Sequence, residues 1–134
     1  MKRITPLFLA AALMTAQATM AETIADTAWT PVALNDTPFE PAGETFVQFN
    51  PDGSYFGKDG CNRIRGRYVT NGDAVLLGPA AATMMACPQE IMEQAQAVTK
   101  ALMAARNYEI RGEELVLLDA EANTLVRLAP RDTE

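Results

Sequence analysis

The stretch RGRYVTNGDAVLL, residues 65–77, contains the clearest hairpin signal in this sequence. At its centre is Asn71-Gly72, a dipeptide that favours a two-residue hairpin turn because both central positions of that turn need positive φ. The segments on either side, 65–70 and 73–77, carry the β-branched, aromatic and large aliphatic residues that are typical of strands. The sequence therefore predicts two antiparallel strands joined at this turn.

Similar turn signals divide the neighbouring sequence into further short strands. NPDG (50–53) separates TFVQF from SYFGK, and Pro-Asp-Gly forms a turn because Pro fixes φ while Gly accepts positive φ. RGEE (111–114) and DAEAN (119–123) separate three more strand-like segments, and residues 29–34 supply one at the front. About eight short strands joined mostly as hairpins predict a mainly β fold, a small antiparallel β-barrel.

One segment has the period of a helix instead. After Cys87, apolar residues recur at alternating spacings of four and three, which places them on one helical face: Ile91, Ala95, Val98, Leu102 and Ala105. Pro88 suits the first helical position, and the segment returns to strand at Asn107. LVLL (115–118) and TFVQF (45–49) are apolar on both faces, so we expect this single α-helix to cover or plug the barrel and to explain both patterns.

The first 21 residues have the pattern of a secretory signal peptide. A basic start at Lys2-Arg3 precedes an apolar run, and the small residues of ATMA (18–21) follow it. We therefore expect cleavage after Ala21, which leaves a domain over residues 22–134 in the periplasm or outside the cell. The apolar run is too short to span a bilayer, and no cysteine follows it closely, so neither a membrane span nor a lipid anchor is expected.

Charge and composition exclude several classes of function. Cleavage removes Lys2 and Arg3 but no acidic residue, so the net charge falls from −6 to −8, which disfavours binding to nucleic acid or an anionic membrane. The chain has no histidine and a single serine, Ser54, which removes imidazole bases and serine–histidine pairs. Two cysteines cannot fill a four-ligand metal site. We expect a monomer with no cofactor, no metal and no catalytic residue.

The two cysteines allow more than one interpretation. Cys61 lies in a turn between Gly60 and Asn62, and Cys87 lies 26 positions later, at the start of the predicted helix. In an oxidising compartment, two lone cysteines are most simply paired as a structural disulfide. Alternatively, helix N–H groups at Cys87 stabilise a reactive thiolate, or the two thiols are buried separately.

Four segments form a recognisable set of motifs: DTAWTPVALND (26–36), GKDGCNRIRGRY (57–68), TMMAC (83–87) and YEIRGEELVLLD (108–119). Their characteristic residues are Trp29, Gly57, Gly60, Cys61, Asn62, Gly66, Tyr68, Thr83, Met85, Ala86 and Cys87. Together these segments resemble a known family, the META domain or HslJ-like proteins. The resemblance implies a small barrel with one helix and a bacterial envelope protein, some relatives being linked to heat shock or drug tolerance. It supplies no catalytic residue, and Met84 stands where relatives often carry a basic residue.

Several side chains have a functional and a structural interpretation. Arg63, Arg65 and Arg67 share one strand face, where they form either an anion clamp for lipid phosphate or, as we favour, a solvated outer face. The methionines form an apolar groove or, as we favour, fill the core: Met84, Met85, Met92 and Met103. Trp29 and the tyrosines are expected to be core anchors, and the turn carboxylates Asp52 and Asp59 are expected to cap N–H groups.

These observations favour a non-enzymatic envelope protein that acts under stress. We expect it to bind a partner protein or an apolar ligand at the barrel mouth or in a cleft between helix and barrel. The alternatives are a thiol redox enzyme that uses Cys87 and a secreted protease inhibitor.

Overall fold

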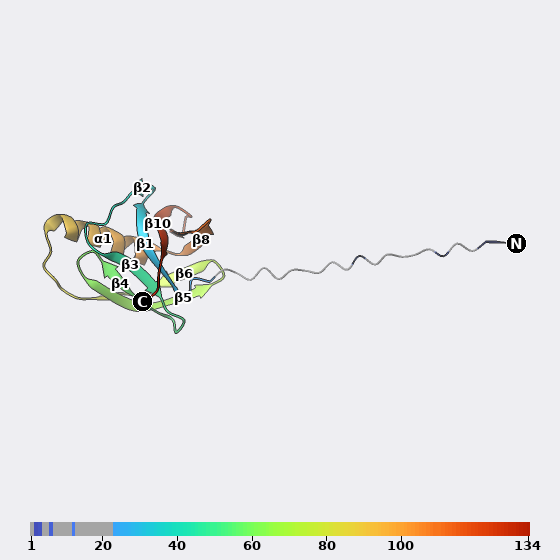
Figure 1. The fold of residues 1–134 in the computed structure, drawn as a ribbon, viewed down its shortest axis with the longest axis horizontal. Coiled ribbons are helices and arrows are strands. Elements are labelled where there is room, and N and C mark those ends of the chain that lie inside the picture. Colours follow the sequence, from blue (N-terminus) through green and yellow to red (C-terminus); the bar gives the residue numbers. More distant parts are fainter. Residues whose placement is uncertain (1, 4–5, 7–11, 13–22) are drawn as a thin grey trace.

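The structure, a computed structural model, describes residues 2–3, 6, 12 and 23–134, so the predicted signal peptide lies almost wholly outside the described residues (Figure 1). The elements are β1 Thr27–Leu34, β2 Thr37–Pro38, β3 Thr45–Phe49, β4 Ser54–Asp59, β5 Arg63–Asn71, β6 Ala74–Leu77, β7 Ala81–Ala82, α1 Gln89–Ala104, β8 Asn107–Arg111, β9 Glu114–Leu118 and β10 Thr124–Arg131. The longer strands are those predicted from turn chemistry, and β2 and β7 are additional strands of two residues each.

The strands pair into a closed antiparallel ring. Their order is β10-β9-β8-β6-β5-β4-β3-β1, and the ring closes because β1 also pairs with β10. β6 and β8 are joined through one residue pair, Ala74 and Asn107. This confirms the prediction of a mainly β fold, a small antiparallel ring of about eight strands with one helix.

The helix closes the interior of this ring. α1 contacts β1, β4, β6 and β10, which belong to different parts of the ring, and Figure 1 shows it packed beside the strands. Its buried side chains Val98 and Leu102 join the same core cluster as Trp29, Phe49 and Leu117 from the strands. The helical period in the sequence therefore marks the face that fills the centre of the fold.

The start of the helix differs by one residue from the prediction. Pro88 has an extended backbone, with φ −52° and ψ 145°, and α1 begins at Gln89. Pro88 therefore precedes the helix instead of forming its first turn. Its carbonyl oxygen still accepts the first helical hydrogen bond, from the backbone N–H of Met92 at 3.0 Å.

The outer face of β3 is covered by the end of the chain and not by the helix, which corrects the expectation above. Phe46 and Gln48 are both buried on this face. The Gln48 amide binds the backbone of Glu134, accepting from its N–H at 2.9 Å and donating to its carbonyl oxygen at 3.4 Å. The Arg131 guanidinium lies 3.8 Å from the centre of the Phe46 ring, a cation–π contact.

Two glycines on neighbouring strands allow close approaches. A Cβ on Gly57 would lie 2.0 Å from the carbonyl oxygen of Phe46, so β3 and β4 can pair here only without a side chain. A Cβ on Gly66 would lie 2.7 Å from the Tyr55 ring, which packs over this glycine from the opposite strand. The Tyr55 hydroxyl then donates to the Gly78 carbonyl at 2.8 Å. Within the described residues, no helix combines the length and hydrophobicity that crossing a bilayer requires.

Candidate functional site

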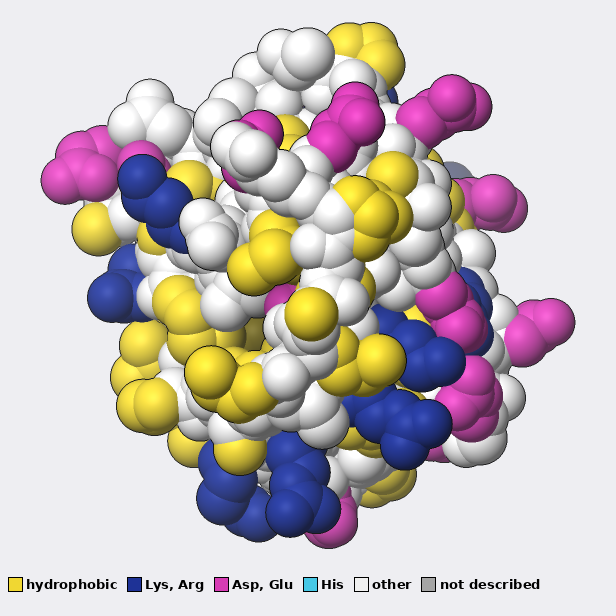
Figure 2. Space-filling model, turned by 90° about the vertical axis from the view of Figure 1, so that its left-hand side faces the viewer, with side chains coloured by type: hydrophobic (Ala, Val, Ile, Leu, Met, Phe, Trp, Pro, Cys, Tyr) yellow, Lys and Arg dark blue, Asp and Glu magenta, His cyan; other side chains and the backbone are white. Residues whose placement is uncertain are grey.

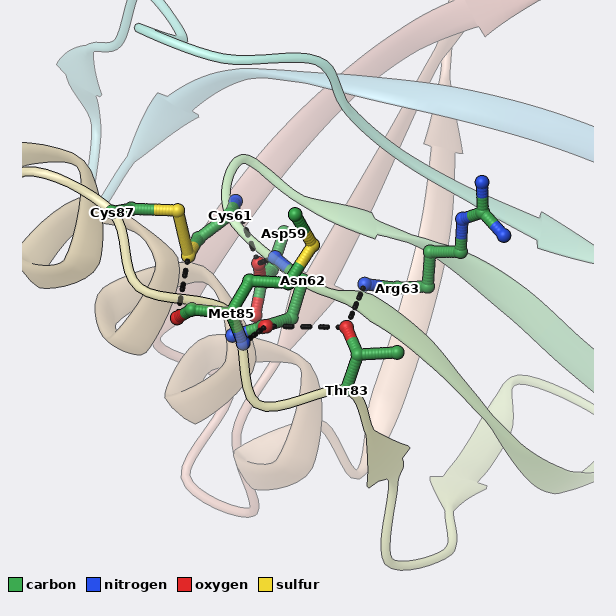
Figure 3. Close-up of a disulfide and its surroundings, with 7 residues drawn as sticks. All are labelled: Asp59, Cys61, Asn62, Arg63, Thr83, Met85 and Cys87. Atoms are coloured by element: carbon green, nitrogen blue, oxygen red, sulfur yellow. Dashed lines mark hydrogen bonds between the residues drawn. A yellow bond between two sulfur atoms is a disulfide. The ribbon is translucent and has the colours of Figure 1, made fainter.

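The motif junction, which we define as residues 59–63 together with 83–87, joins two segments of the predicted motif. Cys61 and Cys87 form a disulfide with a Cα–Cα distance of 6.0 Å. It links the turn after β4 to the segment before α1 (Figure 3). The structure thus contains the pairing that the sequence favoured, and the described residues include no free thiol. A reactive thiolate at Cys87 is absent from this state.

A buried carboxylate organises the first half of the junction. Asp59 is 6% exposed, and its Oδ1 accepts hydrogen bonds from the backbone N–H groups of Cys61 at 2.9 Å and Asn62 at 2.6 Å. Gly60 has φ +102°, a conformation that other residues rarely adopt. Asp52 acts similarly in its own turn, accepting from the Ser54 N–H at 2.9 Å. Both carboxylates cap turns, as the sequence indicated.

Side chains of Asn62 and Thr83 connect the two halves of the junction. The Asn62 Oδ1 accepts from the Met85 N–H at 2.7 Å and from the Thr83 hydroxyl at 3.1 Å. The Thr83 hydroxyl oxygen in turn accepts from the Arg63 N–H at 3.0 Å. The Cys61 Sγ, which carries no hydrogen in a disulfide, lies 3.5 Å from the Met85 carbonyl oxygen. Together with the disulfide, these contacts fix the backbone of residues 83–87 (Figure 3).

The fixed backbone leaves two methionines in solvent. Met84 is 97% exposed and Met85 is 57% exposed, while Met92 on α1 is 39% exposed. The prediction that the methionines fill the core is therefore wrong for these three, and it holds for Met103, which packs against the core. For Met84 and Met85 the physical reason is that hydrogen bonds to Asn62 hold the loop outside the ring. Met92 lies on α1 beside the helix cleft and outside the buried face of the helix.

A hollow of about 420 Å³ lies between the junction and the helix, and we call it the helix cleft. One wall is the turn that contains Asp59 and Asn62, and the other is the face of α1 from Met92 to Lys100. Figure 2 views the side of the molecule where the start of α1 and the loop before it lie. Hydrophobic side chains gather on this side and are bordered by Lys and Arg side chains. The cleft is the helix–barrel cleft expected from the sequence.

A larger hollow of about 600 Å³ lies on the outer side of β3, β4 and β5, and we call it the outer groove. Phe46 and Phe56 meet there edge to face, with ring centres 5.9 Å apart. Arg63, Arg65 and Lys58 also line it. Arg63 and Arg65 share this face because alternate residues of β5 point outward while Ile64 and Tyr68 enter the core, and Lys58 lies opposite Arg63 on β4.

The other predicted motif residues do not gather at the junction. Trp29 and Tyr68 are core residues, as expected: the Trp29 indole N–H donates to Thr27 Oγ1 at 2.7 Å, and the Tyr68 hydroxyl donates to the Asn50 carbonyl at 2.7 Å. Burial raises the pKa of Tyr68, and the charge of Asp52 raises it further. These side chains stabilise the fold and offer no shared site.

In the described part of the chain, the side chains that bind metals most often are scattered. No three acidic, histidine or cysteine side chains there lie close enough together to hold a metal ion. Both sulfurs are bonded to each other, and the buried Asp59 already accepts two backbone hydrogen bonds. The arrangement offers surfaces for contact: the helix cleft, the exposed methionines and the outer groove.

The chain is a small antiparallel ring closed by one helix, and a disulfide fixes the segment before that helix. The sequence matches the META domain over residues 22–132, and the chain belongs to this family. The match bears out the resemblance found in the motifs.

Solved structures share the fold. A DUF4847 family protein from Bacteroides vulgatus matches with a TM-score of 0.60 and 17% identity, over 83% of this chain and 96% of that one. A protein from Burkholderia xenovorans, solved by NMR, matches with a TM-score of 0.63 and 22% identity, over 82% of this chain and 85% of that one. At this identity the likeness concerns the fold alone. No curated protein matches the chain.

Sequence reasoning missed the outer groove and the exposed methionines. Neither Phe46 nor Phe56 belongs to a recognisable sequence motif. Only the strand register places Phe56 directly opposite Arg65. The alternation of arginines in β5 was the one available signal for this surface. For Met84, the departure from the basic residue of related proteins was a signal that the position lies at the surface.

Proposed function

We propose that the chain is an exported, non-enzymatic binding module of a bacterial envelope, and that its helix cleft and exposed methionines bind an apolar segment of a partner protein. Export is supported by the signal-peptide pattern and by the disulfide, which persists in oxidising compartments. A role under envelope stress follows from the family resemblance.

The observation that carries this proposal is the exposure of Met84 and Met85 on a fixed backbone. Exposed methionine side chains adapt to varied apolar surfaces because they are unbranched and polarizable. Their backbone is already ordered by Asn62 and the disulfide, so binding a partner costs little further conformational entropy in the loop. Met92 extends the apolar surface into the helix cleft. A rigid loop with mobile apolar side chains suits a protein partner.

A photocross-linking experiment tests the proposal with a matched control. A photoreactive phenylalanine analogue is placed at Met84 or, as the control, at Val69, which is 65% exposed on β5. We expect a cross-linked partner from position 84 and none from position 69. The purified partner should then bind the M84S/M85S variant at least tenfold more weakly than wild type, and the V69S/L76S variant as tightly as wild type.

Equal cross-linking from both positions, or unchanged affinity in M84S/M85S, would contradict the proposal. The alternatives give different results. A thiol redox enzyme predicts alkylation of a cysteine without prior reduction in protein from an oxidising compartment. A protease inhibitor predicts saturable inhibition of at least one enzyme in a protease panel.

A further inference from the structure

The outer groove contains cations whose charges are not balanced by the protein. Lys58 and Arg131 both pair with Glu44, at 2.8 and 3.1 Å, and Arg131 also pairs with Glu134 at 3.1 Å. Among the described residues, by contrast, no carboxylate forms an ion pair with Arg63 or Arg65. On a chain with net charge −6, two adjacent arginines without a carboxylate partner leave a local site for an external anion.

The strand register places these arginines beside an aromatic surface. Arg63 and Arg65 are two residues apart on β5, so both point outward. Phe56 lies directly opposite Arg65 on β4, and Lys58 lies opposite Arg63. Phe46 follows on β3, opposite Lys58. The groove therefore has its unpaired cations on β5, and its aromatic rings on β4 and β3 together with Lys58, which is paired with Glu44.

The two ends of the groove differ in their free charge. Glu44 and Glu134 both form ion pairs with Arg131, which lies over the Phe46 ring at the β3 end of the groove. The guanidinium of Arg63 extends away from the disulfide (Figure 3). A bound anion is therefore directed to Arg63 and Arg65 and repelled from the carboxylate end. Ala81 and Ala82 belong to β7, which pairs with the edge of β5 opposite β4, and their small side chains line the groove beyond the arginines.

We propose that the outer groove binds a single-chain amphiphile with a phosphate head group. Arg63 and Arg65 donate hydrogen bonds to the phosphate oxygens, because guanidinium groups match phosphate geometry and keep their charge. The apolar chain contacts Phe56 and the alanines. A phosphate monoester, with a charge of about −1.5 to −2, matches two guanidinium groups better than a singly charged carboxylate does. The volume of about 600 Å³ is that of a small-molecule site.

This site adjoins the helix cleft, with which it shares Ile64 and Ala82, but the inference does not rest on the proposed function. The exposed Met84 and Met85 do not line the outer groove. The M84S/M85S variant should therefore bind the amphiphile like wild type, which distinguishes the two proposals.

Isothermal titration of the purified protein with dodecyl phosphate, below its micelle concentration, tests the inference. We expect saturable binding of one molecule per chain. The R63Q/R65Q variant should bind at least tenfold more weakly. The control, R67Q/R111Q, removes the same charge elsewhere: Arg67 donates to the Asp52 carbonyl at 3.0 Å and Arg111 pairs with Glu109 at 2.8 Å. It should bind within twofold of wild type.

Two further probes separate the parts of the ligand. Inorganic phosphate should bind at least tenfold more weakly than dodecyl phosphate, and dodecyl maltoside should show no saturable binding. The inference is overturned if dodecyl phosphate does not bind saturably, or if both double variants lose affinity equally. It is also overturned if either probe binds as tightly as dodecyl phosphate. Because all four arginines are exposed, circular dichroism should show unchanged folding in both variants.

Discussion

Replacing both cysteines, as C61A/C87A, removes the covalent link between the turn after β4 and the start of α1. The two residues are 26 positions apart. The hydrogen bonds of Asn62 to residues 83 and 85 do not involve the sulfurs, so we expect them to keep the folded junction in place. Both cysteines are only half-buried, so the alanine variant leaves no large cavity. The main effect is then on the unfolded chain, which gains conformational entropy when the cross-link is removed.

The chain-entropy relation gives the expected magnitude. Opening a loop of this length lowers the free energy of unfolding by about 3.5 kcal/mol at 25 °C. Single domains unfold with roughly 5–15 kcal/mol, so this is a large share of the total stability. With a urea m-value of about 1.5 kcal/mol/M, the midpoint of unfolding should fall by about 2 M.

Urea unfolding followed by circular dichroism and by Trp29 fluorescence measures this shift. Wild type is compared oxidised and after reduction, beside C61A/C87A. Reduced wild type and the double variant should unfold at similar midpoints, both well below that of the oxidised protein. An unchanged midpoint in C61A/C87A would refute the reasoning. A midpoint in reduced wild type that matches oxidised wild type would refute it too, because the disulfide would then add no stability by constraining the unfolded chain.

Two further perturbations test the packing and the turns. The G57A variant should lose about 3 kcal/mol of unfolding free energy in urea, because its Cβ would meet the Phe46 carbonyl oxygen at 2.0 Å. The G72A variant should lose only about 1 kcal/mol, because position 72 has φ +60° but open space around it. Equal losses in the two variants would contradict this account. The backbone N–H of Asn123 holds the pKa of Asp119 below its ordinary value of 3.8. Because a lowered pKa in the folded state stabilises the protein above that ordinary value, the stability difference between wild type and D119A should be complete near pH 6 and shrink as the pH falls below about 4. If urea unfolding gave the same stability difference between wild type and D119A at every pH, Asp119 would not stabilise its turn through its charge.

Much of the fold follows from local rules that the sequence displays. Gly72 and Pro51-Asp52-Gly53 favour turns because their backbone preferences act over a few residues. The first loop lies one position later than predicted: Asn71 pairs with Ala74, so the two loop residues are Gly72 and Asp73. The helix of residues 89–104 follows from a period that depends only on which face is buried. The closing contacts of the ring, β1 with β10 and β6 with β8, join distant segments, and no local preference specifies them.

The sequence by itself determined the strands, the helix, the alternation along β5 and the simplest pairing of Cys61 with Cys87. Each depends on backbone preference, side-chain period or the chemistry of two lone sulfurs. Only the tertiary structure decided which surfaces are covered: residues after β10 bury the outer face of β3, the loop before α1 leaves Met84 in solvent, and Phe56 lies beside Arg65. Coverage depends on contacts between segments far apart in the chain, and such contacts leave no periodic trace in the sequence.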